Sequence, residues 1–327
     1  MPLKLSYGTF VPQSGANAII DLFRDQSMVL SKNHEYTTRD GHLKGVLCDI
    51  TVQADAAADF EIYAMPNTWK LRNGMRKFHF LRDHMFRESG VTKSEMGKYG
   101  KTIRPYLDAR HVTGTATTVL NPQLSVFSQT DPGLPDDMTQ LDYTGGEWTR
   151  TRFATVPLYE EPVGGGGPEG ILNPADEWVI HLADSNVPQA TSSVGTTVSY
   201  SSVGVVHSYN LDRQSVQTQT TNTSLDGPNN PLAALAASGN QATGEILDIA
   251  EEQEEELPPY SSKDDGDSVK LTRIDRWAYP STYGATHTFR NVFIPAGLFR
   301  VGSSIDAGSF NMIVEVLANV ECRDMVL

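Results

Sequence analysis

Strand-type segments recur along almost the whole chain, and they constrain its fold more than any other feature. They are short runs rich in Val, Thr, Ile and aromatic residues, bounded by Gly, Pro, Asn and Asp. The candidate strands are residues 45–53, 60–65, 112–119, 123–128, 147–159, 177–183, 196–209, 269–279, 286–294 and 309–322. A series of roughly ten such strands is typical of an antiparallel sandwich or a jelly roll. The sequence therefore predicts an all-β fold.

Two stretches have the spacing of helices instead. Near the N-terminus, Ala16, Ile19, Ile20 and Phe23 follow one face of a short predicted helix. A longer stretch, residues 67–100, places apolar residues at helical spacing with basic residues between them. Those apolar residues are Leu71, Met75, Phe78, Leu81, Met85 and Phe86. We predict one or two amphipathic helices here, within a basic helical insertion over residues 66–105.

Two connections between predicted strands are too long to be tight turns. Residues 160–173 contain four consecutive glycines followed by Pro168, a pattern typical of a surface loop. Residues 210–268 include a Gln- and Thr-rich stretch, a helix-like segment at 232–238 and an acidic run. A connection of this length inside a compact domain is usually functional or irregular. We therefore predict an acidic surface excursion over residues 210–268.

Charge is segregated along the chain. The formal net charge is −14, yet residues 66–112 hold eleven cations against four carboxylates, a net charge of +7. Residues 245–267 instead hold ten carboxylates against one lysine, a net charge of −9. Such segregation lets one face of a protein attract a polyanion while another repels it. A solvated charged helix is the alternative explanation of the basic stretch.

The cysteines and the N-terminus bear on the compartment. Cys48 and Cys322 fit neither a disulfide framework nor a metal-ligand pattern. They lie in an early strand and in the last strand, which are often neighbours in a jelly roll, so we expect two nearby free thiols without a disulfide. The N-terminus lacks the apolar core of a signal peptide, and no window approaches the roughly 20 apolar residues of a membrane span. We expect synthesis in a reducing cytoplasm or nucleus.

No catalytic constellation is visible in the sequence. His79 and His84 are five residues apart, which places them on different faces of a helix. The four-glycine run lacks the Lys-Ser or Lys-Thr of a phosphate-binding loop, and the acidic residues 264–267 lack the spacing and closing Glu of a calcium loop. The sequence therefore favours a protein that is not an enzyme and needs no cofactor or metal.

Nucleic-acid contact is the chemistry that the residues favour most. The basic stretch interleaves cations with aromatic residues, which combines attraction to phosphates with rings on which bases can stack. The candidate binding residues are Lys70, Arg72, Arg76, Lys77, Arg82, Arg87, Lys93, Lys98 and Lys101. Farther on, Trp148, Arg150 and Arg152 alternate and would share one face of a strand. A solvated strand face or a subunit contact explains this second group equally well.

Five segments of the chain resemble the capsid proteins of small circular single-stranded DNA viruses, particularly the smacovirus-like lineages. Early in the chain these are residues 30–36 (LSKNHEY) and the strand at 47–51 (LCDIT). Later they are the acidic segment 251–260, which ends in Pro-Pro-Tyr, and residues 274–277 (IDRW) and 293–297 (FIPAG). Together they cover about a tenth of the chain.

The resemblance implies a single jelly-roll capsid domain over residues 1–327, an eight-stranded antiparallel β-sandwich with inserted helices and long surface loops. It implies self-assembly into an icosahedral shell, a virion location, and a packaged single-stranded DNA genome, although the residues themselves leave DNA and RNA open. It implies no membrane partner. Residues 1–45 carry a net charge of only +1, where many such proteins have a strongly basic arm. The inserted basic helices are the natural substitute.

Two other functions remain open from the sequence. One is a β-sandwich adhesin or carbohydrate-binding module, in which exposed Trp148, Trp178 or Trp277 would stack on sugar rings. The other is a jelly-roll enzyme of the cupin type, which would need clustered His and carboxylate ligands. The chain contains no H-x-H…E arrangement of that kind. The capsid interpretation is therefore the first hypothesis.

Overall fold

The structure is a computed structural model of residues 1–327. The described residues are 2–10, 17–30, 32–54, 57–88, 90–92, 95, 102–113, 117–128, 137–143, 148–154, 177–184, 201–214, 270–280, 283–303 and 310–325. Of the acidic excursion expected at 210–268, only the first five residues belong to this set, and they end a helix. The acidic run and the four-glycine loop lie outside it.

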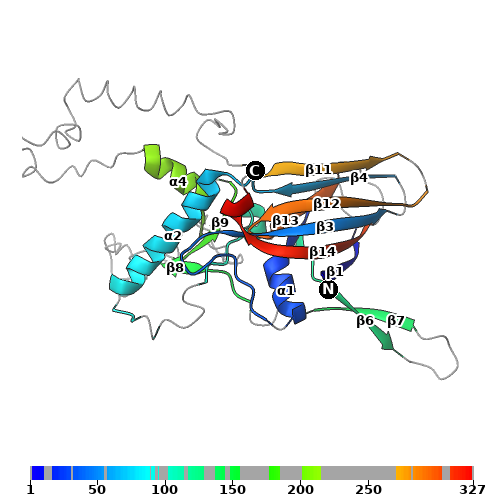
Figure 1. Cartoon of the computed structure of the whole chain (residues 1–327), viewed down its shortest axis with the longest axis horizontal. Helices are drawn as coiled ribbons and strands as arrows, with labels where there is room; N and C mark the ends of the chain where they lie inside the picture. Colours follow the sequence, from blue (N-terminus) through cyan, green and yellow to red (C-terminus); the bar gives the residue numbers. More distant parts are fainter. Residues whose placement is uncertain are drawn as a thin grey trace, which may run out of the picture.

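Two antiparallel sheets form the main body of the molecule (Figure 1). One has the order β1 (Leu3–Phe10), β14 (Phe310–Glu321), β3 (Lys44–Ala54), β12 (Ala285–Pro295). The other has the order β11 (Thr272–Tyr279), β4 (Ala58–Ala64), β13 (Leu298–Ser303), β2 (Asn17–Asp21), β5 (Thr117–Val119). Every pairing is antiparallel except that of β2 with β5. Apart from β5, consecutive strands of these sheets alternate between the two sheets along the chain, except that β4 and β11 lie side by side in the second.

The core lies between these two sheets. Strand β3 shows the period-2 pattern that buries alternate side chains, so Val46, Cys48, Ile50 and Val52 all face inward. Across the core, the ring of Phe60 in β4 lies 5.4 Å from that of Phe310 in β14 and 6.0 Å from that of Phe289 in β12. The predicted all-β sandwich class is thus confirmed.

The chain between β4 and β11 carries most of the other elements. In chain order they are α2 (Trp69–Glu88), α3 (Ala109–Thr113), β5, β6 (Gln123–Ser128), β7 (Asp137–Asp142), β8 (Arg152–Ala154), β9 (Glu177–His181), β10 (Ser201–Gly204) and α4 (Val205–Gln214). Strands β10, β9 and β8 form a small third sheet, and β6 pairs with β7 as a hairpin. We call residues 65–271 the insertion. Its helices α2 and α4 lie at one end of the sandwich (Figure 1).

Two further helices belong to the sandwich connections. Helix α1 (Leu22–Leu30) links β2 to β3, and a short 3-10 helix (Cys322–Met325) follows β14. The backbone carbonyl of Leu43 accepts a 2.9 Å hydrogen bond from the N–H of Cys322, so the end of β14 stays next to the start of β3.

Arg150 of the insertion is buried against the sandwich end. Its guanidinium lies 2.7 Å from the carboxylate of Asp21 in β2. It also donates to the Tyr36 hydroxyl at 2.8 Å and to the Pro105 carbonyl at 2.9 Å. Burial alone would lower the pKa of Arg150, but the oxygens of Tyr36 and Asp21 outweigh it and raise that pKa. A buried charge held this way joins the insertion to the sandwich.

A second buried ion pair lies beside the first. Asp25 of α1 accepts a 2.6 Å hydrogen bond from the Tyr7 hydroxyl and a 2.9 Å bond from Nε of Arg24. Arg24 also donates to the backbone carbonyl of Leu120 at 2.6 Å. Burial raises the pKa of Asp25 to about 7, despite the opposing charge of Arg24. This cluster connects β1, α1 and the residues that follow β5.

Several local predictions are wrong. Residues 17–21, expected to begin a helix, form β2, because both Ile19 and Ile20 are fully buried in a strand that pairs with β13 and β5. The strand expected over 196–209 becomes helix α4 from Val205 onward. Among the described residues 148–154 of the strand expected at 147–159, only 152–154 are strand, and helix α3 occupies the start of the one expected at 112–119.

Four strands were not predicted from the sequence: β1, β2, β7 and β13. Three of them, β1, β2 and β13, belong to the two main sheets. Strand β13 is only six residues long, and it follows β12 after a turn with positive φ at Ala296 and Gly297. The expected strand at 286–294 is β12, so the sequence predicted the strand before this turn and missed the strand after it, which belongs to the other sheet.

Both cysteines are buried and free, as expected. Burial raises the pKa of each thiol to about 12. Cys48 lies in β3, and Cys322 directly follows the neighbouring strand β14, so the expected pairing of the early strand with the last strand is confirmed. The thiols themselves are not close, because Cys48 pairs with Val316 while Cys322 follows the pair of Glu321 with Lys44. About five residues along a strand correspond to roughly 16 Å.

Candidate nucleic-acid interface

The predicted amphipathic helix is α2, a single 20-residue helix. It begins after Thr68, whose hydroxyl accepts a hydrogen bond from the Leu71 N–H at 3.3 Å and so caps the first turn. It ends in a Schellman motif, in which Gly90 has a φ of 73°. The N–H of Gly90 bonds to the Arg87 carbonyl at 3.1 Å, and that of Val91 to the Phe86 carbonyl at 3.0 Å.

One face of α2 packs on its neighbours. Leu71 and Met75 are fully buried. Between them, Gly74 lies so close to α4 that an added Cβ would be 3.1 Å from the Val205 side chain. Farther along, the ring of Phe78 meets that of Phe153 in β8 at 5.5 Å. The helix is thus held between α4 and the small third sheet.

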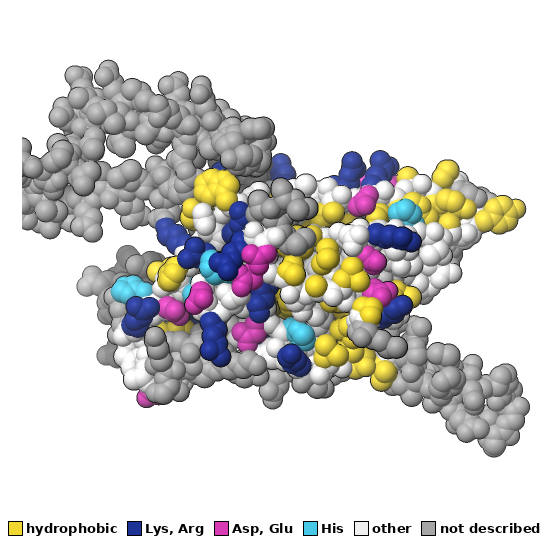
Figure 2. Space-filling model, viewed as in Figure 1, with side chains coloured by type: hydrophobic (Ala, Val, Ile, Leu, Met, Phe, Trp, Pro, Cys, Tyr) yellow, Lys and Arg dark blue, Asp and Glu magenta, His cyan; other side chains and the backbone are white. Residues whose placement is uncertain are grey.

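The structure places six of the nine predicted binding residues on α2. They are Lys70, Arg72, Arg76, Lys77, Arg82 and Arg87. With Asp83 and Glu88 as the helix's acidic residues, these six give α2 a formal charge of +4. Lys93, Lys98 and Lys101 lie outside the described residues. Figure 2 shows Lys and Arg side chains over the part of the surface to which α2 contributes.

The six cations differ in how they are held. Lys77 and Arg87 are exposed, whereas Arg72 is half-buried and donates to the backbone and side-chain oxygens of Asn67, both at 3.3 Å. Arg82 donates to the backbone carbonyl of Thr102, and burial lowers its pKa. Arg82 therefore supports the fold around α2, in addition to any role in binding.

Three cations of α2 lie over aromatic rings of the same helix. Lys70 is 5.8 Å from the ring centre of Trp69, Arg76 is 5.8 Å from that of Phe80, and Arg82 is 5.3 Å from that of Phe86. Such pairs are attracted through the negative face of the ring. The interleaving of rings and cations expected from the sequence is therefore present in space along α2.

The second predicted group does not form the expected surface. Trp148 and Arg150 precede β8 and are not strand residues, so the prediction that they share a strand face with Arg152 is wrong. Arg150 is engaged by Asp21, as described above. The half-buried ring of Trp148 lies 3.9 Å beneath the guanidinium of the buried Arg104. Of the three, Arg152 alone is exposed. Their partners are distant in sequence, which is why the alternation was misleading.

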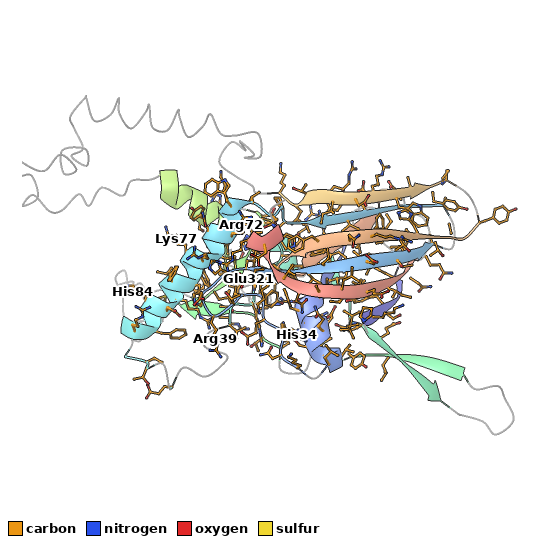
Figure 3. All side chains as sticks on the ribbon, in the orientation of Figure 1. His34, Arg39, Arg72, Lys77, His84 and Glu321 are labelled. Atoms are coloured by element: carbon orange, nitrogen blue, oxygen red, sulfur yellow. The ribbon has the colours of Figure 1, made fainter. Side chains whose placement is uncertain are left out.

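A turn near α2 adds a cation that sequence analysis missed. Residues 37–43 form a turn closed by the bridge between Thr37 and Leu43. The turn touches α2 at Gly41, where an added Cβ would be 2.6 Å from the ring of His79. Exposed Arg39 belongs to this turn, and Figure 3 shows it in the same view as Arg72, Lys77 and His84 of α2. The sequence around Arg39 is nearly neutral, so charge alone did not mark this residue as a candidate for binding.

Other site chemistry is sparse in the described parts of the chain. His79 of α2 is buried and lies 3.6 Å from the carboxylate of Asp83, one helical turn away. Within the described ranges, no three His, Cys, Asp or Glu residues come together in a way that could hold a metal ion. Nor does any helix among these residues have the length and apolar character needed to cross a bilayer.

Comparison with known proteins yielded no relative. A scan against protein-family models, a search of curated proteins and a search of solved structures each gave no match. Functional inference therefore depends on the topology of the sandwich and on the surface of α2.

Proposed function

We propose that the two main sheets form a jelly roll. Without β5, the two sheets contain eight strands. In chain order, from first to eighth, they are β1, β2, β3, β4, β11, β12, β13 and β14. The first then pairs with the eighth, the second with the seventh, the third with the sixth and the fourth with the fifth. Four nested antiparallel pairs rolled into two sheets are the topology of a jelly roll. Strand β5 extends one edge.

We infer from this topology that the protein is a viral capsid subunit that self-assembles into an icosahedral shell around a small single-stranded DNA genome. The nested strand pairing carries the proposal, because it is the fold that the capsid-like segments imply. Jelly rolls also occur in lectins and cupins, so the fold alone supports several functions. The cationic, ring-bearing helix α2 favours the capsid function among them.

The outer face of the β11–β4–β13 sheet carries charge pairs between neighbouring strands. Arg276 forms a bidentate pair with Asp59 at 2.7 and 2.9 Å, and Arg273 pairs with Glu61 at 2.9 Å. Farther across this sheet, Arg300 of β13 lies 3.4 Å from Asp108 of the insertion. Cross-strand charge pairs of this kind favour one arrangement of side chains. A shell then closes through many modest contacts between such subunits.

Electron microscopy of the purified full-length protein tests the proposal. We expect closed particles of uniform size, and an absorbance ratio at 260 and 280 nm above that of protein alone when they form in the presence of nucleic acid. Salt titration provides the control, since phosphate contacts weaken steeply as ionic strength rises. A strictly monomeric protein at every salt and protein concentration would refute the capsid function.

A carbohydrate-binding module is the second candidate, and one observation favours it. The ring of Trp277 stacks on that of His287 at 5.4 Å and 11°, and on that of Tyr279 at 5.7 Å and 21°. Trp277 is half-buried and packs against the core, so a sugar would contact only the exposed part of this stack. Trp148, by contrast, is occupied by Arg104. Glycan-array binding by a monomer that forms no particles would support this candidate over the capsid.

A further inference from the structure

Five residues share the solvent-facing side of α2. Lys77, Phe80, Leu81, His84 and Arg87 follow the i, i+3, i+4, i+7, i+10 spacing of one helical face, and all five are exposed. We call this set the outer stripe. The opposite face, with Leu71 and Met75, is buried against α4 and the core.

The outer stripe contains large apolar side chains where a solvated helix would be polar. Phe80 is 54% exposed and Leu81 is 52% exposed, although they are adjacent on the helix. Isolated exposed apolar residues are common, but an exposed ring next to an exposed leucine on a cationic helix is a local apolar spot. A ligand for this spot should itself combine an apolar surface with negative charge.

The surroundings of Phe80 supply both features that such a ligand needs, an apolar ring and nearby cations. Arg76 lies one turn before Phe80, and its guanidinium is 5.8 Å from the centre of the ring. Along the stripe, Lys77 and Arg87 stand on either side of the ring, about 15 Å apart by the rise of a helix. Asp83, three residues after Phe80 and on the same side of the helix, lies 3.6 Å from His79.

We propose that the outer stripe of α2 binds single-stranded nucleic acid through an unpaired base stacked on Phe80, with Lys77 and Arg87 contacting phosphates on either side. This inference rests on the proposed function, because it names how the packaged strand is held. A flat base buries the ring and Leu81 while its phosphates stay near the cations. A duplex offers phosphates only, because its bases are already stacked.

A contact with a second protein chain is the competing use of the stripe. The buried centre of a protein interface is depleted of charged residues. Here cations surround the apolar spot, with Arg76 over the ring itself and Lys77 one turn along the same stripe. Burying these cations against protein would require a carboxylate for each of them. A nucleic acid strand supplies its phosphates at regular intervals, so the observations favour it.

Fluorescence anisotropy with the full-length protein tests this inference. The probes are a labelled oligothymidylate and a labelled duplex of the same length, titrated over a series of salt concentrations. We expect Phe80→Ala to weaken oligothymidylate binding about tenfold or more, because stacking on an aromatic ring contributes about 1–3 kcal/mol per base. The salt dependence and the duplex affinity should not change. Lys77→Gln should instead lower the salt slope for both probes.

Three further variants keep the result interpretable. Phe80→Trp retains a ring and should bind at least as well as the wild type, whereas Phe80→Leu retains only apolar bulk and should behave like the alanine variant. Tyr283→Ala removes another exposed ring, in the turn between β11 and β12, and should bind like the wild type. Unfolding temperatures of all variants should agree, since Phe80 and Tyr283 are exposed.

Three outcomes would overturn the inference. Equal weakening of both probes by Phe80→Ala would mean that the ring acts through the fold or the charge, and no weakening would mean that it does not stack. Loss of self-association with unchanged oligothymidylate affinity would assign the stripe to a protein contact. Because binding is measured whether or not particles form, a failure of the capsid function is distinguished from a failure of the stacking site.

Discussion

The sandwich and the insertion are stabilised by different kinds of contact. Within the sandwich, β3 lies between β14 and β12, and alternate apolar side chains along it share one core. Apolar side chains of the insertion, such as Leu71 and Met75, also reach that core, but buried polar contacts such as that of Arg150 with Asp21 help to join it to the sandwich. Truncating a core side chain leaves a cavity within the sandwich, whereas removing one partner of a buried charge pair leaves an uncompensated charge where the two regions meet. We therefore expect a core substitution to destabilise the sandwich, and loss of the charge pair to loosen the insertion from it.

The largest effect is expected in the shared core. Phe60→Ala removes the ring that contacts both Phe289 and Phe310, and we expect it to lower the free energy of unfolding by about 4 kcal/mol. Urea denaturation followed by fluorescence measures this loss. Ile313→Ala, on the exposed outer face of β14, is the matched control and should change stability little. Similar losses for both variants would contradict the assignment of the core.

Removing the charge of Arg150 should separate the two regions. Arg150→Met leaves the buried carboxylate of Asp21 without its cation, at a cost of about 3 kcal/mol. Hydrogen exchange should show faster exchange at the amides of Tyr106 and Leu182 in the insertion, while β3 and β14 stay protected. The exposed Arg152→Met is the control. Equal loss of protection in both regions would show that they unfold as one unit.

The pH dependence of stability should depend on Asp25. Its folded pKa of about 7 exceeds the ordinary carboxyl value near 3.9, so the folded state holds a proton that the unfolded chain has released. The free energy of unfolding should therefore fall as pH rises from about 4 to about 7, and stay level above that.

Asp25→Asn should remove this part of the pH dependence. Relative to the variant, the wild type should lose about 2 kcal/mol between pH 5 and pH 8, measured by urea denaturation at each pH. Glu315→Gln, which removes a surface partner of Lys4, should instead give a curve parallel to the wild type. Parallel curves for Asp25→Asn would place the folded pKa of Asp25 near its ordinary value.

The smallest effect is expected at the end of α2. Gly90 has a φ of 73° and nothing within 4 Å of an added Cβ, so Gly90→Ala adds backbone strain without a clash. We expect a loss of about 1 kcal/mol, measured by thermal unfolding. Gly90→Asn should lose less, because Asn tolerates the left-handed region. An alanine variant as stable as the wild type would mean that the Schellman motif does not stabilise α2.

Sequence patterns predicted elements wherever local periodicity matched the packing. The alternation in β3 and the helical spacing of Leu71, Met75 and Phe78 both follow from one face being buried, and both elements were predicted. Helix α4 was not, because Val205 and Val206 have strand propensity. Packing against Gly74 of α2 overrides that propensity. Strand β2 was misread for the related reason that it is buried on both sides.

The sequence predicted which cations belong to the candidate site, but not which of them are bonded within the fold and which are exposed. The run of cations on α2 is visible in the sequence, as are its rings. The sequence does not show that Arg82 is bonded to the Thr102 carbonyl, or that Phe80 is exposed while Phe78 meets Phe153. Those differences depend on which side of the helix the third sheet covers.

The sequence by itself determined the all-β class, the long cationic helix and the free thiols, because each follows from local composition or spacing. The tertiary structure decided the nested pairing of β1 with β14 and of β2 with β13, the burial of Arg150 and the exposure of the outer stripe. Each of these depends on residues far apart in the chain, such as Asp21 and Arg150. Their contacts form only when the sheets bring them together, and no local pattern records them.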